Sequence, residues 1–140
     1  MAFTGNYSCN TLRSGLVSGS IDFSTDTFYL ALYTNAATLN QTTTEYTASN
    51  EASGGDYAAG GQVVTATVSS ATTSSGSVEY ISFSSPAWTG QITARGALIY
   101  KAGTNGAICV LDFGNDKTSS STFTVQMPAN TSTSALIRLV

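Results

Sequence analysis

From Asp22 to its end, the sequence is a series of short stretches rich in β-branched and aromatic residues, separated by residues that favour turns. Such stretches at short spacing are typical of antiparallel β-sandwiches and barrels, and they do not alternate with helical stretches as in a parallel α/β sheet. We therefore predict an all-β fold, an antiparallel β-sandwich or barrel of about seven strands with a short N-terminal helix. The predicted strands are Thr27–Thr34, Gln62–Val68, Ser77–Phe83, Ile92–Tyr100, Ala107–Asp112, Thr122–Met127 and Ala135–Val140.

The first predicted strand, Thr27–Thr34, carries apolar residues on both of its faces. Successive side chains of a strand point to opposite sides of the sheet. Both sides of this strand are therefore expected to be covered, as in a sandwich or at a subunit contact. One side presents Phe28, Leu30 and Leu32, and the other presents Tyr29, Ala31 and Tyr33.

The N-terminal residues 1–20 are predicted to contain one short helix. They include apolar residues but no evident strand partner, so we expect them to serve as a possible N-terminal contact arm. No composition shift marks a linker, and we predict a single β-sandwich domain over residues 1–140. The expected helix has Ser8 as its N-cap, an apolar face made by Leu12, Leu16 and Val17, and an end at Ser18–Gly19.

Residues 35–61 form the longest stretch without a strand pattern, and long loops tend to be functional or mobile. The glycines of 54–61 are interpreted as turns that lead into the next strand, because the Lys-Ser/Thr ending of a phosphate-binding loop is absent. The Ser/Thr-rich stretch 69–77 is predicted to be an exposed turn. Asn105-Gly106 is expected to supply the positive φ that turns the hairpin between the strands on either side.

Hydroxyl side chains are abundant in this chain, whereas charges are scarce. The 140 residues include 22 Thr and 20 Ser, but only eight acidic and five basic residues and no His. The absence of His excludes a Ser-His-Asp triad and a His metal ligand. The apolar stretches are too short for a membrane span. We therefore expect no membrane partner. Nucleic-acid binding requires clustered cations. We expect no nucleic-acid partner, because the five cations are scattered at Arg13, Arg95, Lys101, Lys117 and Arg138.

Three pairs of carboxylates lie close together in the sequence, and such pairs can hydrolyse glycosides or bind calcium. All of them stand beside Ser, Thr, Asn or Gly, where Asp commonly forms turns. The stretch 112–114 has the letters of the kinase magnesium motif without its companion motifs, so we predict that Asp112 ends a strand and Gly114 turns the chain. We expect no enzyme, and we assign no catalytic, cofactor-binding or metal-binding residue and no cofactor. The pairs are Asp22 with Asp26, Glu45 with Glu51, and Asp112 with Asp116.

The two cysteines and the single tryptophan each have a structural interpretation. Cys9 and Cys109 are expected to be reduced, because the N-terminus lacks the basic and apolar regions of an export signal. Cys109 lies in an apolar stretch and is expected to be buried; whether it pairs with Cys9 stays open. Trp88 follows a Pro turn and is expected to cap one end of the core rather than to stack on a sugar.

Four fragments follow one another along the chain: Ala31–Thr34, Gly55–Gly61, Ile92–Tyr100 and Leu111–Gly114. In this order they resemble a group of small virion structural proteins of tailed bacteriophages, and the resemblance extends from about Phe3 to the C-terminus. It implies a β-rich virion component without enzymatic activity. It brings no catalytic or ligand residues with it.

These observations lead us to expect a capsid decoration (cement) protein, made in the host cytoplasm, that binds the major capsid protein on the capsid exterior. A homotrimer suits threefold and quasi-threefold positions of a shell. Low charge together with seven tyrosines also favours protein contacts. The expected contact regions are Ala2–Leu16 and residues 35–61. The alternatives are a tail, neck or fibre component of the virion, and a carbohydrate-binding β-sandwich that uses Trp88 and tyrosines.

Overall fold

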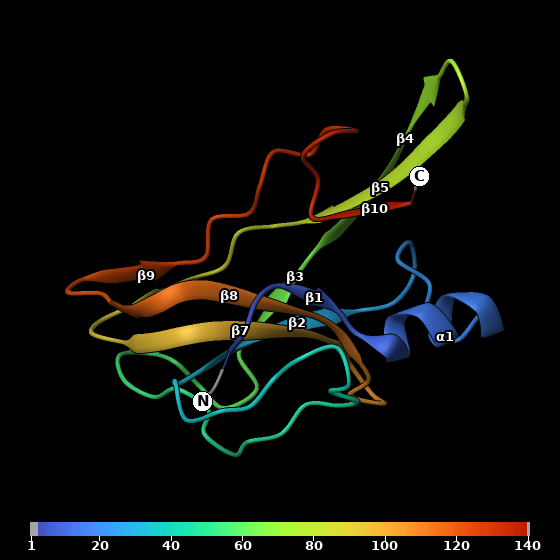
Figure 1. Ribbon diagram of the computed structural model, residues 1–140. Helices are drawn as coiled ribbons and strands as arrows, with labels where there is room; N and C mark the ends of the chain where they lie inside the picture. Colours follow the sequence, from blue (N-terminus) through green and yellow to red (C-terminus); the bar gives the residue numbers. More distant parts are fainter. Residues whose placement is uncertain (1–2, 140) are drawn as a thin grey trace.

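The centre of the molecule is a five-stranded antiparallel sheet with the strand order β1-β8-β7-β2-β3 (Figure 1). The computed structural model describes residues 3–139. Strand β7 lies at the middle of the sheet and pairs with β2 on one side and β8 on the other. The strands of this sheet are β1 (Tyr7–Ser8), β2 (Phe28–Tyr33), β3 (Gln62–Val64), β7 (Thr93–Lys101) and β8 (Ala107–Thr118).

A second layer of strands packs against one face of the central sheet. It consists of a three-stranded antiparallel sheet with the order β10-β5-β4 and of the antiparallel pair β6-β9. Phe28 and Leu30 from the central sheet pack in one core with Phe83, Trp88 and Phe123 from this layer. The predicted all-β, antiparallel sandwich is confirmed. The strands of the second layer are β4 (Ala66–Thr73), β5 (Gly76–Phe83), β6 (Ala87–Thr89), β9 (Thr122–Thr124) and β10 (Ile137–Leu139).

The opposite face of the central sheet is covered by the loop formed by residues 35–61, which lies beneath β2 and β7 in Figure 1. Ala31 and Tyr33 of β2 pack there with Ala37 and Leu39 of the loop. The prediction that both faces of this strand are covered is therefore confirmed. The loop contains no named strand or helix, also as predicted.

The N-terminal helix α1 (Asn10–Ser18) ends as predicted, because Gly19 adopts the left-handed conformation with φ 81°. Its beginning differs from the prediction. Cys9 is the N-cap and makes no capping hydrogen bond through its side chain, while Ser8 belongs to β1. The predicted apolar face is also only partly correct, because the side chain of Val17 is 91% exposed.

The N-terminal segment has a strand partner, contrary to the prediction. Tyr7 and Ser8 pair with Val110 and Cys109 at the edge of the central sheet. Phe3 is buried and forms a parallel bridge with Leu39. A β-strand of two residues has too little pattern to be recognised in a sequence. Part of the expected contact region Ala2–Leu16 is therefore used for packing within the chain, while residues such as Asn10 and Arg13 are exposed. Ala2 lies outside the described residues.

The Ser/Thr-rich stretch 69–77, predicted to be an exposed turn, instead forms the half of a long hairpin that lies around its turn. Strands β4 and β5 pair from Ala66–Phe83 to Thr73–Gly76, so the turn itself is only Ser74-Ser75. Thr is β-branched and therefore favours an extended backbone. The hydrogen bonds between β4 and β5 satisfy the peptide groups, so the hairpin forms although its sequence shows no alternation of apolar residues. The hairpin extends beyond the rest of the molecule (Figure 1).

Other strand boundaries differ because the chain changes sheets or bulges. The predicted strand Gln62–Val68 is divided at Thr65, where the chain passes from the central sheet to the second layer. Asp112 does not end a strand, because β8 continues to Thr118 after a register shift opposite Arg95. Gly114, with φ 88°, lies within this irregular part of β8. The predicted strands 122–127 and 135–140 are shorter, and Val140 lies outside the described residues.

Gly61 allows the end of the loop to lie directly against β2. Its φ is +81°, and a Cβ atom at this position would lie 1.8 Å from the carbonyl oxygen of Leu30. We predict that Gly61→Ala lowers the free energy of unfolding by about 3 kcal/mol or more, since left-handed strain adds to a backbone clash. Urea denaturation measures this change.

Gly103→Ala is the matched control. Gly103 has a similar φ of +91°, but a Cβ atom there would meet nothing within 4 Å. The expected loss is therefore only the left-handed strain of about 1 kcal/mol. Equal losses for the two variants would contradict the close approach of Gly61 to β2.

Candidate functional site

The carboxylates singled out in the sequence are held by local contacts. Asp22 accepts hydrogen bonds from the backbone and hydroxyl of Ser24, and these bonds hold the pKa of Asp22 below its usual value. Asp26 accepts a hydrogen bond from the backbone N–H of Asp22 and forms an ion pair with Lys101 at 3.4 Å. These contacts close a turn around Asp22 and Asp26.

The remaining pairs are separated by the fold or engaged elsewhere. Asp112 forms an ion pair with Arg95 at 3.0 Å, whereas Asp116 accepts a hydrogen bond from Asn35. Glu45 is exposed and its backbone bridges to Gly106, whereas the backbone of Glu51 bridges to Tyr33 of β2. Within residues 3–139, no three His, Cys, Asp or Glu side chains come together as a metal-ligand set.

Glu51 forms the most connected polar cluster on the loop side of the sheet. Its Oε1 accepts a hydrogen bond from the hydroxyl of Tyr46 at 2.7 Å. Its Oε2 accepts one from the hydroxyl of Tyr57 and one from the backbone N–H of Gly60 at 2.8 Å. Donors from three parts of the loop therefore meet at one carboxylate, and hydrogen bonds to a charged acceptor are stronger than neutral ones.

Tyrosines connect this cluster to the central sheet. The backbone N–H of Leu32 in β2 donates to the hydroxyl of Tyr57 at 2.9 Å. The hydroxyl of Tyr100 in β7 donates to the carbonyl of Gly60 at 2.6 Å, and the ring of Tyr100 stacks on that of Tyr46 at 4.8 Å. The loop 35–61 is thus fixed to the sheet by hydrogen bonds as well as by apolar contacts. Sequence reasoning missed this cluster; the available signal was Glu51 between two tyrosines of the same loop, Tyr46 and Tyr57.

The tyrosine hydroxyls of this cluster favour the neutral form. Burial raises the pKa of Tyr100 to about 12, and the negative charge of Glu51 acts in the same direction. Burial and the hydrogen bond to Glu51 raise the pKa of Tyr46 to about 12. The pKa values of Tyr33 and Tyr57 are also raised, mainly by burial. At neutral pH these groups therefore act as hydrogen-bond donors.

We predict that the folded protein loses stability as the pH rises from 10 to about 12. A tyrosine with its ordinary pKa of 10.0 in the unfolded chain ionises before Tyr46 and Tyr100 do in the folded protein, where their pKa values are about 12. The unfolded state then binds fewer protons than the folded state, so the free energy of unfolding falls. Below pH 10 the contribution is complete. Urea unfolding at increasing pH, with tyrosinate absorbance followed in parallel, checks this; constant stability through pH 12 would contradict it.

Glu51→Gln is predicted to loosen the loop. The amide keeps the size of the side chain but replaces one acceptor oxygen with a donor, so at least one of the donors from Tyr46, Tyr57 and Gly60 loses its partner. The expected loss is about 2 kcal/mol in the free energy of unfolding, with faster protease cleavage within 35–61. The exposed Glu45 of the same loop supplies the control, Glu45→Gln. Similar effects of both variants would show that the Glu51 contacts are unimportant.

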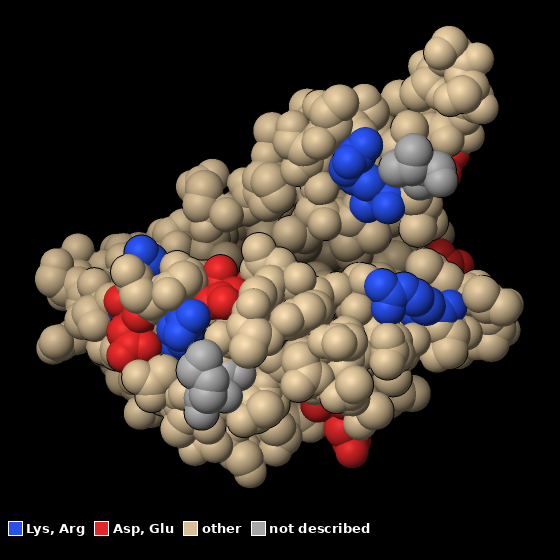
Figure 2. Space-filling view, viewed as in Figure 1, with Lys and Arg blue, Asp and Glu red and all other residues tan. Residues whose placement is uncertain are grey.

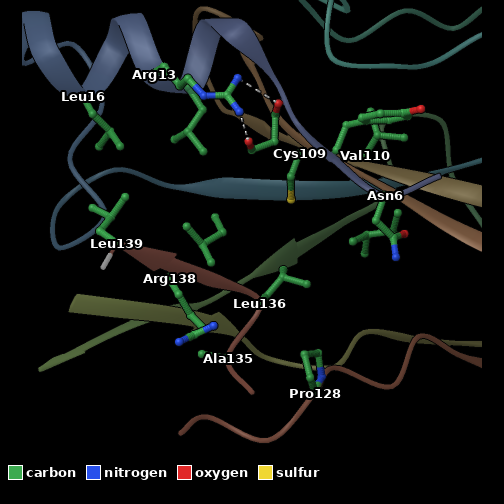
Figure 3. Close-up of a pocket in the computed structure, with 15 residues that line it drawn as sticks. Asn6, Arg13, Leu16, Cys109, Val110, Pro128, Ala135, Leu136, Arg138 and Leu139 are labelled. Carbon is green, nitrogen blue, oxygen red and sulfur yellow. Dashed lines mark hydrogen bonds between the residues drawn. The ribbon is translucent and has the colours of Figure 1, made fainter. Parts of the chain in front are cut away.

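An open groove of about 520 Å³ lies on another side of the molecule, between α1 and β1 on one wall and β10 on the other (Figure 3). Its apolar lining includes Leu12 and Leu16 from the helix and Leu136 and Leu139 from the C-terminal segment. Strands β1 and β10 are each the last strand of their sheet, so two sheet edges border the groove. The groove therefore combines apolar side chains with strand edges.

Two arginines line this groove, and no Asp or Glu is among its lining residues. The guanidinium of Arg13 donates to the hydroxyl of Ser8 at 2.9 Å, and Arg138 donates through Nε to the carbonyl of Ser132 at 2.7 Å. Most of the surrounding face carries no charged side chain (Figure 2). Because Arg13 and Arg138 are at opposite ends of the sequence, no local pattern predicted that they would line one groove. The arrangement suits an acidic, partly apolar segment of another molecule.

Trp88 lies in the core, as predicted. Its side chain is 4% exposed, and its ring is 5.3 Å from that of Tyr57. A sugar-stacking platform requires an exposed ring face, which Trp88 does not offer.

The two cysteines are buried and unbonded. Cys109 faces the core shared with the second layer, whereas Cys9 packs in the core on the loop side of the sheet. Their thiols therefore face different sides of the same sheet, although Ser8, the neighbour of Cys9, pairs with Cys109. The question that the sequence left open is answered: Cys9 and Cys109 do not pair.

Comparison of the chain with protein-family models, curated proteins and solved structures finds no match. Among residues 3–139, none of the helical structure reaches the length and apolar character that crossing a bilayer requires.

Proposed function

We propose that this protein is a structural component of a tailed-bacteriophage virion, a capsid decoration protein that binds the outside of the assembled shell. The observation that carries the proposal is the groove between α1 and β10, which offers apolar side chains, sheet edges and two arginines without an acidic residue. The phage resemblance of the sequence supports the same class. In this proposal the occupant of the groove is an acidic, partly apolar segment of the major capsid protein.

The remaining surface favours binding over catalysis. Only 13 of the 140 residues are charged, eight acidic and five basic, and depletion of charge is typical of the cores of protein interfaces. The carboxylates of Asp22, Asp26 and Asp112 are engaged in turns or ion pairs. Glu51 fixes the loop. These contacts leave the groove as the feature best suited to a function.

The proposed mechanism is stabilisation by mass action. A ligand that binds only the assembled lattice shifts the equilibrium towards that lattice, by an amount set by its concentration and affinity. A homotrimer on threefold and quasi-threefold positions would engage several capsid subunits at once, so modest contacts add through avidity. The fixed conformation of loop 35–61 lowers the entropy lost on binding wherever its exposed residues take part.

A tail, neck or fibre location is the alternative within the same class, because the same groove could receive a segment of any virion protein. Labelling of the protein in intact particles distinguishes the two. Decoration predicts label over the whole shell, whereas label confined to one vertex or to the tail would favour the alternative. The carbohydrate-binding alternative relied on Trp88 as a stacking platform, and the ring of Trp88 is buried.

Reversal of the groove charges is predicted to weaken capsid binding. The variant with Arg13→Glu and Arg138→Glu turns two positive charges into two negative ones, which would repel an acidic segment. We expect at least about tenfold weaker binding to expanded empty capsids of the encoding phage, measured by co-sedimentation at low salt. Each single variant, Arg13→Glu or Arg138→Glu, changes the net charge by as much as Lys117→Glu, which replaces an exposed cation outside this groove and serves as their matched control.

Wild-type protein that does not sediment with the capsids would contradict the decoration function. Unchanged binding of the double variant would instead contradict the groove as the contact. The melting temperature of each variant shows whether its fold is retained, so loss of folding is recognised separately.

A further inference from the structure

Strand β4 is an open edge of the second layer. The order of its sheet is β10-β5-β4, so Ala66–Thr73 pairs with β5 on one side and, within residues 3–139, with no strand on the other. An edge strand presents unpaired N–H and C=O groups along its length, and these can pair with another chain. Eight residues is a long open edge for a domain of this size.

The position of the hairpin leaves this edge accessible. The β4–β5 hairpin stands out from the rest of the molecule (Figure 1), and β4 lies on the side of β5 away from β10. Val68, near the middle of β4, is 49% exposed, and no part of β4 is buried. A second strand can therefore approach β4 without meeting the body of the protein.

None of the usual features that protect an edge is present in β4. Proteins commonly place Lys, Pro or a bulge on an edge strand to prevent pairing with other chains. The whole stretch 57–78 contains no charged residue and no Pro, and the register of β4 with β5 is uninterrupted. The exposed edge is therefore neutral, extended and compatible with pairing.

We propose that β4 pairs antiparallel with β4 of a second copy of this chain across a twofold axis. The axis is perpendicular to the sheet, so one residue near the centre of Ala66–Thr73, either Ser69 or Ser70, faces its own counterpart. The two three-stranded sheets then form one continuous sheet. An isologous contact of this kind is the commonest way in which identical chains associate.

The composition of β4 favours its own copy as the partner. A strand that pairs with itself brings like charges together wherever it carries a charge, and β4 carries none. Its Ser and Thr hydroxyls face other residues of the same small polar set, and such cross-strand pairs are favourable. The nearest charge is Glu79 on β5, opposite Ser70. The Glu79 residues of the two copies would be three strand spacings apart, about 14 Å, beyond the screening length of about 8 Å.

This inference does not depend on the proposed function, because it concerns a contact between copies of the chain alone. It also uses a different surface from the groove. A twofold contact at β4 and a threefold arrangement elsewhere can therefore coexist in one assembly.

Disulfide trapping tests the contact directly. Ser69→Cys and Ser70→Cys each place one thiol near the proposed axis, and Ser75→Cys places a thiol at the exposed turn of the same hairpin as a control. After mild oxidation of the full chain, we expect a covalent dimer on a non-reducing gel from one of the two central variants, which also identifies the register. No dimer above the level of Ser75→Cys from either variant would overturn the proposal.

A charge placed on the edge provides the second measurement. Ser70→Lys introduces the protection that β4 lacks, and Ser75→Lys adds the same charge at the turn. We expect Ser70→Lys to weaken self-association by at least about tenfold in sedimentation velocity, while Ser75→Lys behaves as the wild type. Equal self-association of the three proteins would overturn the proposal. Neither experiment contains capsids, so its outcome is independent of the test of the proposed function.

Discussion

The central sheet is buried on both faces although only one of them is covered by strands, and the rest of the structure depends on how the other face is closed. Residues 35–61 perform this task without regular structure, so their peptide groups need other partners. The carboxylate of Glu51 accepts hydrogen bonds from the hydroxyls of Tyr46 and Tyr57 and from a backbone N–H. These bonds hold the irregular loop in one conformation. Gly61, which has no Cβ atom, allows the end of this loop to lie against the backbone of β2. In a hydroxyl-rich chain with few charges, one partly buried carboxylate thus fixes much of the longest loop.

The sequence predicted those parts of the fold in which local pattern and burial agree. The two-sided apolar pattern of Phe28–Tyr33 indicated a strand covered on both faces, and Gly19 indicated the end of the helix. Prediction failed where pairing alone determines the structure. The Ser/Thr-rich strand β4 has no apolar period, and β1 is too short to show one. In β8, the register shift opposite Arg95 is invisible in the sequence, because a bulge depends on the partner strand.

The candidate site was less predictable than the fold. The groove is lined by the helix near the N-terminus and by the C-terminal strand, and only the folded chain brings Arg13 and Arg138 to the same surface. The four fragments on which the resemblance rests lie in β2, β7, β8 and the covering loop, and of these residues only Leu111 is among those that line the groove. The groove itself is lined by residues of α1, β1, β8 and β10 and of the segment before β10, so most of its lining lies outside these fragments.

The placement of the two thiols has a consequence for the conditions in which the protein can operate. Cys9 and Cys109 are buried on opposite sides of one sheet, and burial raises the pKa of both, that of Cys9 to about 11. Thiol exchange requires an accessible thiolate, so neither side chain is ready to react with an oxidant or with its counterpart. As long as the chain stays folded, an oxidising medium is therefore not expected to join Cys9 to Cys109. The two thiols therefore contribute to the fold as small buried side chains and not as a redox-sensitive cross-link.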